Sequence, residues 1–389
     1  MTTPAPQPLR LGFIGGGATS AVGYTHYAST HLDGLFQLEA GVFSRNAATN
    51  AASAKAYGIA AGRMHPDWQT LLQAERGRLD ALAILTPMPS HAEIVIAALE
   101  AGFPVICEKP LGTSRDECVA IQQAVEQNQG FLAVTFNYSG YPMVRELRAL
   151  IHAGELGEIQ QIHAEMPQEG FARRSASGEA AKPQAWRLSD YAVPTVALDL
   201  GVHVHHLIHF LTGAHPLQVI ADQSTYGNFP AVVDNVNCLA RYSSGISANI
   251  WFGKAALGYR NGLRIRVFGS KGSAEWLQVA PEQLQMAYAD GRRCSLDLGS
   301  GGLTVASQPR YNRFKPGHPS GFIEAFANLY TDIARQLRIG SLAAPDGENY
   351  VFGADHAVDG LDFFEAAHRS AQEHSWQHLG RSQDTPAHG

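Results

Sequence analysis

A short apolar strand near the start of the chain, expected over 11–14, runs directly into a turn dense in glycine, Gly15-Gly16-Gly17. Gly15 permits a tight turn, and Gly17 lets the backbone approach a pyrophosphate because it has no Cβ. The helix that follows would direct its free N–H groups at the phosphates. Ser20 stands where the third glycine of this fingerprint is usual, and a small residue there still allows close packing of helix and strand. The stretch predicts the beginning of a dinucleotide-binding unit.

Strand-like and helix-like segments alternate through the first 130 residues. We expect strands at 37–43, 79–85 and 104–107 and helices at 47–57, 91–101 and 114–128. Such alternation is typical of a parallel sheet covered by helices on both faces. The sequence therefore predicts a doubly wound α/β domain, a Rossmann domain, over 1–140.

Beyond residue 140 the pattern changes to strands joined by short turns. After a helix at 143–153, strands are expected at 159–166, 217–226, 236–242, 246–252, 263–268 and 274–279. This order favours an α+β domain over 141–389, with a large, open and mostly antiparallel sheet. A long segment at 168–195 is expected to be a lid, a binding loop or disordered. Amphipathic helices at 322–337 and 353–372 belong to this domain or pack back on the first one.

Composition excludes several classes of partner. The formal charge is −6 and no cluster of Lys or Arg occurs, which argues against nucleic acid. No apolar run approaches the roughly 20 residues that a membrane span needs. Four cysteines, Cys107, Cys118, Cys238 and Cys294, lack metal-type spacing and are expected to be reduced core thiols of a cytoplasmic protein.

Lys109 lies just past the expected strand 104–107, in the segment Glu108-Lys109-Pro110. Parallel sheets bind ligands at the carboxyl ends of their strands. Apolar neighbours there disfavour the charged form of a lysine, which suits proton transfer. The alternative is a surface lysine in a turn.

A second group of polar residues is Asp199 and His203. On a helix these two side chains share one face, so the carboxylate can orient the imidazole or bind the same substrate. Histidine is a natural general base for a hydroxyl proton. His205, His206 and His209 follow, but no acidic residue between them completes a zinc-protease pattern. We expect solvated or core-packed histidines there and no metal.

These motifs together resemble the glucose–fructose oxidoreductase/inositol dehydrogenase/MocA-like (Gfo/Idh/MocA) family. The resemblance rests on the glycine turn 15–20, Thr86-Pro87 with His91, Glu108-Lys109-Pro110-Leu111 and Asp199-x-Gly-x-His203. It implies a Rossmann domain, an open sheet used for oligomer contacts, a cis Lys109-Pro110 peptide, and the catalytic residues Lys109, Asp199 and His203.

The segment 317–326 resembles a branch of sugar and anhydrosugar dehydrogenases, the levoglucosan dehydrogenase-like branch. Within it, Ser320 is also a plain helix N-cap.

The choice between NAD and NADP depends on the end of the second strand. An acid that holds the ribose hydroxyls of NAD is usual there, whereas this strand ends in Ser44-Arg45, which can receive a 2′-phosphate. The resembling branch often uses NAD with small polar residues, so both cofactors stay open and NAD is preferred. Cofactor contacts are expected from Gly15, Gly17, Ala18, Thr19, Ser20, Ser44, Arg45, Thr86, Pro87, His91, Glu108 and Lys109.

The expected reaction is oxidation of a secondary hydroxyl on a cyclic polyol, sugar, anhydrosugar or glycoside. His203 would take the hydroxyl proton, Lys109 would hydrogen-bond the same oxygen, and Asp199 would grip a neighbouring hydroxyl or orient His203. Further substrate contacts are expected from Tyr138, Trp186, Arg187 and His318. An NAD-dependent glycosidase and a non-catalytic dinucleotide sensor are the alternatives, and a homodimer or homotetramer through the second sheet is expected.

Overall fold

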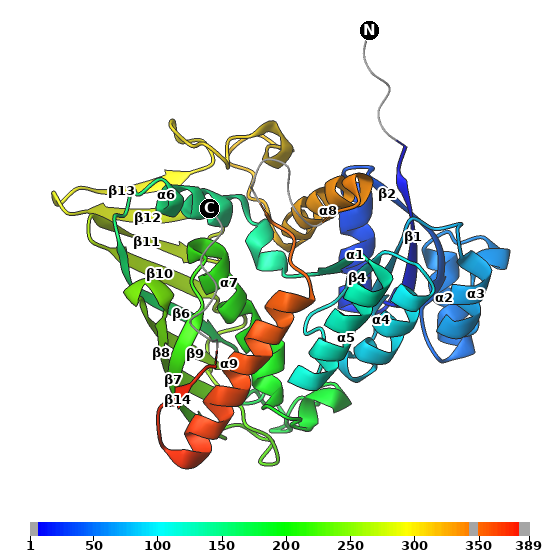
Figure 1. Cartoon of the computed structure of the whole chain (residues 1–389), viewed down its shortest axis with the longest axis horizontal. Coiled ribbons are helices and arrows are strands. Elements are labelled where there is room, and N and C mark those ends of the chain that lie inside the picture. The colour runs from blue at the N-terminus through cyan, green and yellow to red at the C-terminus, as the bar shows by residue number, and fades with distance from the viewer. Residues whose placement is uncertain (1–6, 342–348, 381–389) are drawn as a thin grey trace, which may run out of the picture. The chain divides into compact units, whose positions relative to one another are not determined.

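The computed structural model describes residues 7–341 and 349–380 (Figure 1). These residues fall into two compact units. The first runs to Pro142 and also includes Pro309–Val358, and the second comprises Met143–Gln308 and the chain from Asp359 onward. Within the ranges that the structure describes, no helix combines the length and the apolar character that a membrane crossing requires.

A five-stranded sheet forms the centre of the first unit, in the order β2-β1-β3-β4-β5, and every adjacent pair is parallel. The strands are β1 (Leu9–Gly15), β2 (Phe36–Val42), β3 (Ala81–Leu85), β4 (Val105–Cys107) and β5 (Leu132–Val134). All residues of β3, β4 and β5 are buried, as expected when helices cover both faces of a sheet. The predicted α/β fold of this part of the chain is therefore confirmed.

Helices follow the strands along the first unit, and one more helix joins it from far along the chain. These helices are α1 (Ala21–Leu32), α2 (Ala47–Ala56), α3 (Trp68–Glu75), α4 (His91–Glu100), α5 (Arg115–Asn128) and the later α8 (Phe322–Ile339). Side-chain N-caps fix where several of them begin. Ser114 caps α5 by accepting the Glu117 N–H, and Asp67 caps α3 by accepting the Thr70 N–H. Helix α8, which lies far along the chain from α1, packs on α1 and adds Phe326 to the core of this unit.

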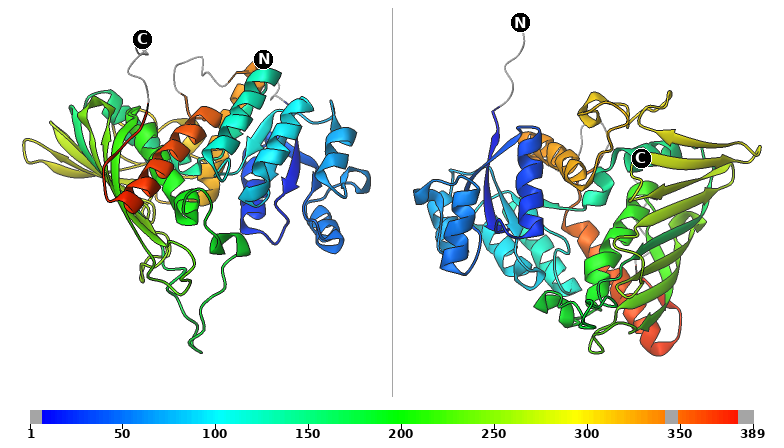
Figure 2. Two further views of the ribbon diagram at one scale, coloured as in Figure 1. Left: turned by 60° about the horizontal axis from the view of Figure 1, so that its bottom comes forward. Right: turned by 180° about the vertical axis from the view of Figure 1, so that it is seen from behind.

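The second unit contains a nine-stranded sheet in the order β13-β12-β11-β10-β6-β9-β8-β7-β14. Figure 2 shows these strands side by side, with β12 and β13 in yellow at one edge. The strands are β6 (Ile159–Pro167), β7 (Pro216–Ser224), β8 (Asn235–Tyr242), β9 (Ser247–Gly253), β10 (Arg264–Gly269), β11 (Gly272–Leu277), β12 (Gln283–Tyr288), β13 (Arg293–Asp297) and β14 (Gln377–His378). Burial alternates along β8, so one face of the sheet packs against the core and the other faces outward.

The predicted mostly antiparallel sheet is confirmed, with one exception. β6 and β9 run parallel, from the pair Gln161–Ser247 to the pair Pro167–Gly253. Parallel strands need a long crossover, and the chain between these two strands supplies it with α7 (Val202–Thr212), β7 and β8. The remaining helices are α6 (Pro142–His152) and α9 (Ala354–Glu373).

Candidate active site

The glycine turn after β1 lies close to the backbone of the two neighbouring strand ends, which leaves no room for side chains. Gly15 and Gly16 have φ values of +85° and +67°, in the left-handed region that favours glycine. A Cβ on Gly15 would lie 2.7 Å from the carbonyl carbon of Leu85 at the end of β3. At Gly17 an added Cβ would lie 3.3 Å from the carbonyl oxygen of Phe43, just past β2. The turn therefore lies where β1 meets its two neighbours, at the carboxyl edge where such sheets bind ligands.

The structure corrects the role given to Ser20. Its Oγ accepts the N–H of Gly23 at 3.4 Å, so Ser20 is the N-cap of α1. The close approach of helix and turn is made by Gly23, where an added Cβ would lie only 2.1 Å from the Gly16 carbonyl oxygen. Gly23 thus performs the packing function of the third glycine, and the sequence interpretation missed it because its spacing departs from the usual fingerprint.

Side chains around α2 hold the turn in place. The Ala18 N–H donates to Ser53 Oγ at 3.1 Å, and the Tyr57 hydroxyl donates to the Gly16 carbonyl oxygen at 2.9 Å. Burial raises the pKa of Tyr57 to about 12, so this hydroxyl stays a donor at neutral pH. Thr19 is exposed at the start of α1. The glycines and this helix N-terminus form a cradle that fits a pyrophosphate.

Ser44 and Arg45 follow one residue after the end of β2, at the same sheet edge as the glycine turn. Ser44 Oγ accepts the Asn46 N–H at 3.1 Å, while Arg45 is exposed. Asn50 fixes the strand end by accepting the Phe43 N–H at 2.7 Å. The Arg45 guanidinium and the Ser44 hydroxyl thus lie at the sheet edge where the ribose of a dinucleotide would bind.

His91 joins the segments that follow β3 and β4. Its Nδ1 lies 2.8 Å from the Pro110 carbonyl oxygen and its Nε2 lies 2.8 Å from the Thr86 carbonyl oxygen. Burial lowers the pKa of His91 and outweighs the hydrogen bonds to the two carbonyls, which by themselves would raise it. The ring is therefore a brace between Thr86-Pro87 and the Lys109-Pro110 peptide, which is cis as the resemblance implies.

Glu108, immediately before Lys109, faces the interior of the first unit. Its Oε1 accepts the His26 Nε2–H at 2.9 Å and also the Thr135 hydroxyl. His26 Nδ1 in turn lies 2.6 Å from the Tyr330 hydroxyl of α8. Burial alone would raise the pKa of Glu108, but the His26 bond and the charge of Lys109 outweigh it and the pKa lies below its usual value. Lys109 thus has a buried carboxylate as its neighbour in the chain.

In the second unit, Asp199 and His203 are both buried, but not on one regular α-helix as predicted. Asp199 lies in a π-helical turn, Ala197–Gly201, that runs directly into α7, where His203 lies in the first turn. A Cβ on Gly201 would lie 2.7 Å from the Phe364 ring, so only glycine allows this approach to α9. Single π turns inside helices are frequent at functional sites.

Two cations contact the Asp199 carboxylate at the same oxygen. Arg187 Nε donates to Oδ2 at 2.9 Å, and Lys254 Nζ lies 2.7 Å from Oδ2. Arg187 also stacks on Trp186, with 4.1 Å from the guanidinium carbon to the ring centre. The structure therefore brings three predicted site residues together. The structure adds Lys254 to this group of residues. In the sequence, Lys254 stands out only by its position directly after strand β9.

The other predicted substrate contacts lie in the first unit. Tyr138 is buried, and its ring is stacked 6.2 Å from Tyr141 and tilted 6.2 Å from Phe322. His318 is exposed in the segment before α8. The N-cap of α8 is Gly321, not Ser320, because the Gly321 N–H is accepted by the Glu324 side chain at 2.8 Å.

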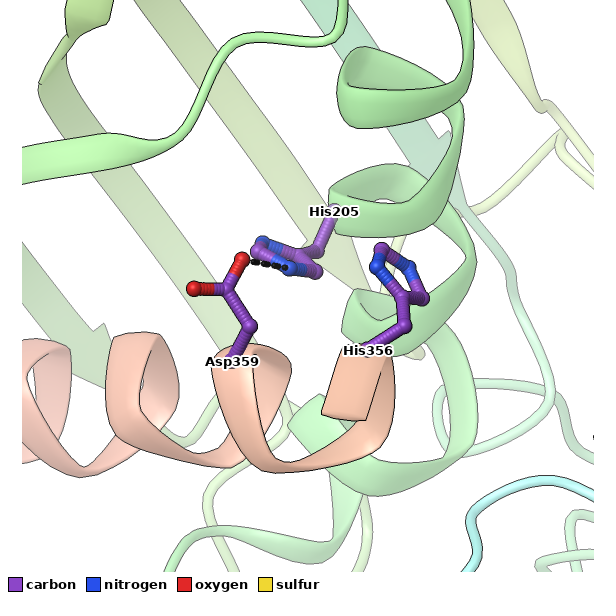
Figure 3. Close-up of side chains that lie close together, drawn as sticks. All are labelled: His205, His356 and Asp359. Carbon is purple, nitrogen blue, oxygen red and sulfur yellow. Dashed lines mark ion pairs between the residues drawn. The ribbon is translucent and has the colours of Figure 1, made fainter. Parts of the chain in front are cut away.

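The three histidines after His203 pack into the second unit. His205 and His206 are buried, and His205 Nε2 lies 3.4 Å from Asp359 Oδ2 of α9. Figure 3 shows this ion pair, with His356 one turn before Asp359 on the same helix. Burial lowers the pKa of His206 well below its usual value and that of His209 to about 4, so both rings are neutral at pH 7.

Comparisons with known proteins agree with this architecture. Residues 9–136 match the family model described as "Oxidoreductase family, NAD-binding Rossmann fold", and residues 144–275 match the GFO/IDH/MocA C-terminal domain. The Bacillus subtilis oxidoreductase YfiI is 31% identical over 95% of this chain and 96% of its own length. Levoglucosan dehydrogenase of Pseudarthrobacter phenanthrenivorans is 26% identical, over 73% of this chain and 77% of its own.

Among solved structures, an inositol dehydrogenase homolog from Azotobacter vinelandii, complexed with NADH and myo-inositol, is 28% identical with a TM-score of 0.86. The match covers 96% of this chain and 98% of that one.

Proposed function

Because the chain belongs to the GFO/IDH/MocA family of NAD-binding oxidoreductases, we propose that it oxidises one secondary hydroxyl of a cyclic polyol, sugar or anhydrosugar. The family and the dehydrogenases among its relatives make it a sugar or polyol dehydrogenase. The observation that carries the finer proposal is the buried Asp199 carboxylate with its two cations, one turn before His203. A buried ionised carboxylate and an imidazole are suited to bind and deprotonate hydroxyl groups.

Bound NAD would accept the hydride of the carbinol carbon. In the proposed reaction His203 takes the hydroxyl proton as general base. The Lys109 ammonium donates a hydrogen bond to the same oxygen and stabilises its developing negative charge. Asp199 accepts a hydrogen bond from a neighbouring hydroxyl and so fixes which carbon reacts. Tyr138, Trp186, Arg187 and His318 are proposed as further substrate contacts.

The cofactor contacts proposed are the glycine turn, the start of α1, the segment after β2 and the segment at Thr86-Pro87. An added Cβ on Gly15 or Gly17 would come into close contact with neighbouring atoms. The absence of these Cβ atoms supports the proposal that a pyrophosphate binds at this turn. Glu108 and His91 are among the predicted cofactor contacts, but their side chains bond to protein atoms in the interior. Their proposed role is therefore indirect: they fix the segment that carries Lys109.

The proposal is tested with purified protein, NAD or NADP, and a panel of inositols, free pyranoses, glycosides and anhydrosugars. Reduced nicotinamide, followed by its absorbance, should accumulate in step with the ketone product. Lys109→Met and His203→Ala should lower kcat by at least about 100-fold, the size of a general acid–base contribution, and leave NADH affinity unchanged. Near-normal turnover in both variants would remove these roles, and hydrolysis without accumulated NADH would indicate the NAD-dependent glycosidase.

We also propose a homodimer or homotetramer through the outward face of the second sheet. By register, Leu239 of β8 and Phe268 of β10 lie on the same face, and both are more than one-third exposed. Exposed apolar side chains on a sheet face support an interface between copies. Light scattering of the purified protein checks this. None of the four cysteines, all of which the structure describes, forms a disulfide, which supports a cytoplasmic location. Cys107, Cys118 and Cys238 are buried, whereas Cys294 lies exposed on the edge strand β13 and is not the predicted core thiol.

A further inference from the structure

Lys254 begins from a rigid backbone position. It directly follows β9, and its N–H donates to the Asp234 carbonyl oxygen at 2.7 Å. Its own carbonyl oxygen accepts the Phe171 N–H at 2.8 Å. Asp234 is fully buried, and its carboxylate accepts the backbone N–H groups of Tyr226 and Gly227. The end of β9 is therefore held by several segments, and the direction in which the lysine side chain leaves the sheet is fixed.

The side chain of Lys254 is 7% exposed, so its ammonium has been taken almost wholly out of water. A buried ammonium is tolerated when it is paired and hydrogen-bonded. Its Nζ lies 2.7 Å from Asp199 Oδ2, 3.3 Å from Gln168 Oε1 and 5.6 Å from the centre of the Phe171 ring. These neighbours confine the ammonium beside the Asp199 carboxylate.

Arg187 contacts the same oxygen but comes from a long connecting segment and not from the end of a strand. Its side chain is 28% exposed, and it comes from the long segment between β6 and the π turn. Lys254 comes from the end of a sheet strand and is much less exposed. Two cations beside one carboxylate favour its ionised form. The sheet-borne lysine thus supplies the fixed part of this contact, and the arginine supplies the more solvent-accessible part.

We propose that Lys254 is a positioning residue that holds Asp199 ionised and correctly oriented for the substrate hydroxyl, through an ammonium–carboxylate pair at Oδ2. This inference rests on the role proposed above for Asp199. Lys254 acts through Asp199, because its Nζ lies 2.7 Å from that carboxylate and its side chain is only 7% exposed. The pair couples the rigid sheet to the π turn, whose C-terminal end leads to His203.

The test compares Lys254→Met, which removes the charge and keeps the stem, with Lys254→Arg, which keeps the charge. Lys182→Met, at an exposed lysine in the segment between β6 and the π turn, is the matched control. With a substrate that the wild type oxidises, K254M should lose at least about tenfold in kcat/KM, because small displacements of a positioning group have effects of this size. K254R should recover most of the loss, K182M should match wild type, and NADH affinity should not change in any of them.

A double-mutant cycle with Asp199→Asn separates positioning from general damage. If Lys254 acts through Asp199, K254M should cost less than about twofold in the D199N background, because the shared interaction is already lost. Equal losses in both backgrounds, or wild-type kinetics of K254M, would overturn the inference while leaving the proposed function intact. If K254M does not fold, Lys254→Gln carries the same comparison. A wild type inactive with every member of the panel would refute the proposed function and this inference with it.

Discussion

The position of α1 against the glycine turn depends on Gly23, and Gly23→Ala tests this most sharply. An added Cβ would lie 2.1 Å from the Gly16 carbonyl oxygen and 2.7 Å from that of Gly17, whereas real Cβ contacts essentially never fall below 3.0 Å. Both obstacles are backbone atoms, so the helix and the turn must separate by about 0.9 Å. Overpacking of this kind costs roughly 1–3 kcal/mol. A loss of about 2 kcal/mol corresponds to a fall in Tm of roughly 4–8 °C for a domain of this size.

The same displacement moves the start of α1 away from the proposed phosphate position. Interactions of an anion with a helix N-terminus contribute up to about 2 kcal/mol, so loss of most of it weakens NADH binding by about tenfold. Fluorescence titration with NADH and thermal unfolding measure both effects. Gly62→Ala is the matched control, because a Cβ there meets no atom within 4 Å. If G23A and G62A gave the same NADH affinity and the same Tm, the proposed contact between α1 and the turn would be refuted.

Two further predictions concern the first unit. Because the pKa of Glu108 lies below its usual value, its ionised form stabilises the fold above about pH 4.5, and this contribution is lost as the pH falls further. Glu108→Gln should therefore lower the free energy of unfolding at pH 7 by roughly 1–3 kcal/mol and weaken the dependence of that free energy on pH in acid. Urea unfolding from about pH 3 to 7 measures this, and an equal change of unfolding free energy with pH in wild type and E108Q would contradict it. Arg45→Asp should lower NADPH affinity by at least about tenfold and leave NADH affinity equal or higher, because an acid there repels a 2′-phosphate and can accept hydrogen bonds from ribose hydroxyls. Equal losses of affinity for both cofactors in fluorescence titrations would show that Arg45 does not discriminate between them.

Features encoded by local sequence pattern were predictable. The alternation of apolar strands with helices up to residue 130 and the strands from β6 to β11 each leave a short-range signal, and the predicted fold class is confirmed. Strand β12 and the two edge strands, β13 and β14, were missed. β13 is largely exposed and lacks a clear apolar alternation, and β14 has only two residues. The parallel pairing of β6 with β9 depends on which distant segments meet, and no local pattern encodes it.

Parts of the site were hidden for the same reason. Motif spacing predicted the glycine turn and Asp199 as site residues, but the contacts of Asp199 come from a long segment and from a strand end far along the chain. Nothing around Lys254 distinguishes it from a lysine that simply ends a strand. Gly23 was missed because the fingerprint placed the close approach at Ser20, while the fold places it in the first turn of α1. Long-range packing decides each of these cases.

Transfer of the carbinol hydrogen to the nicotinamide tests the proposed reaction most directly. A polyol or sugar oxidised by the enzyme is prepared with deuterium at the reacting carbon and incubated with NAD and the wild-type protein, and the reduced cofactor is analysed by NMR. The account predicts one deuterium at C4 of the nicotinamide with wild type and at least about 100-fold slower transfer with His203→Ala. Reduced cofactor without deuterium, or equal transfer by H203A, would contradict it.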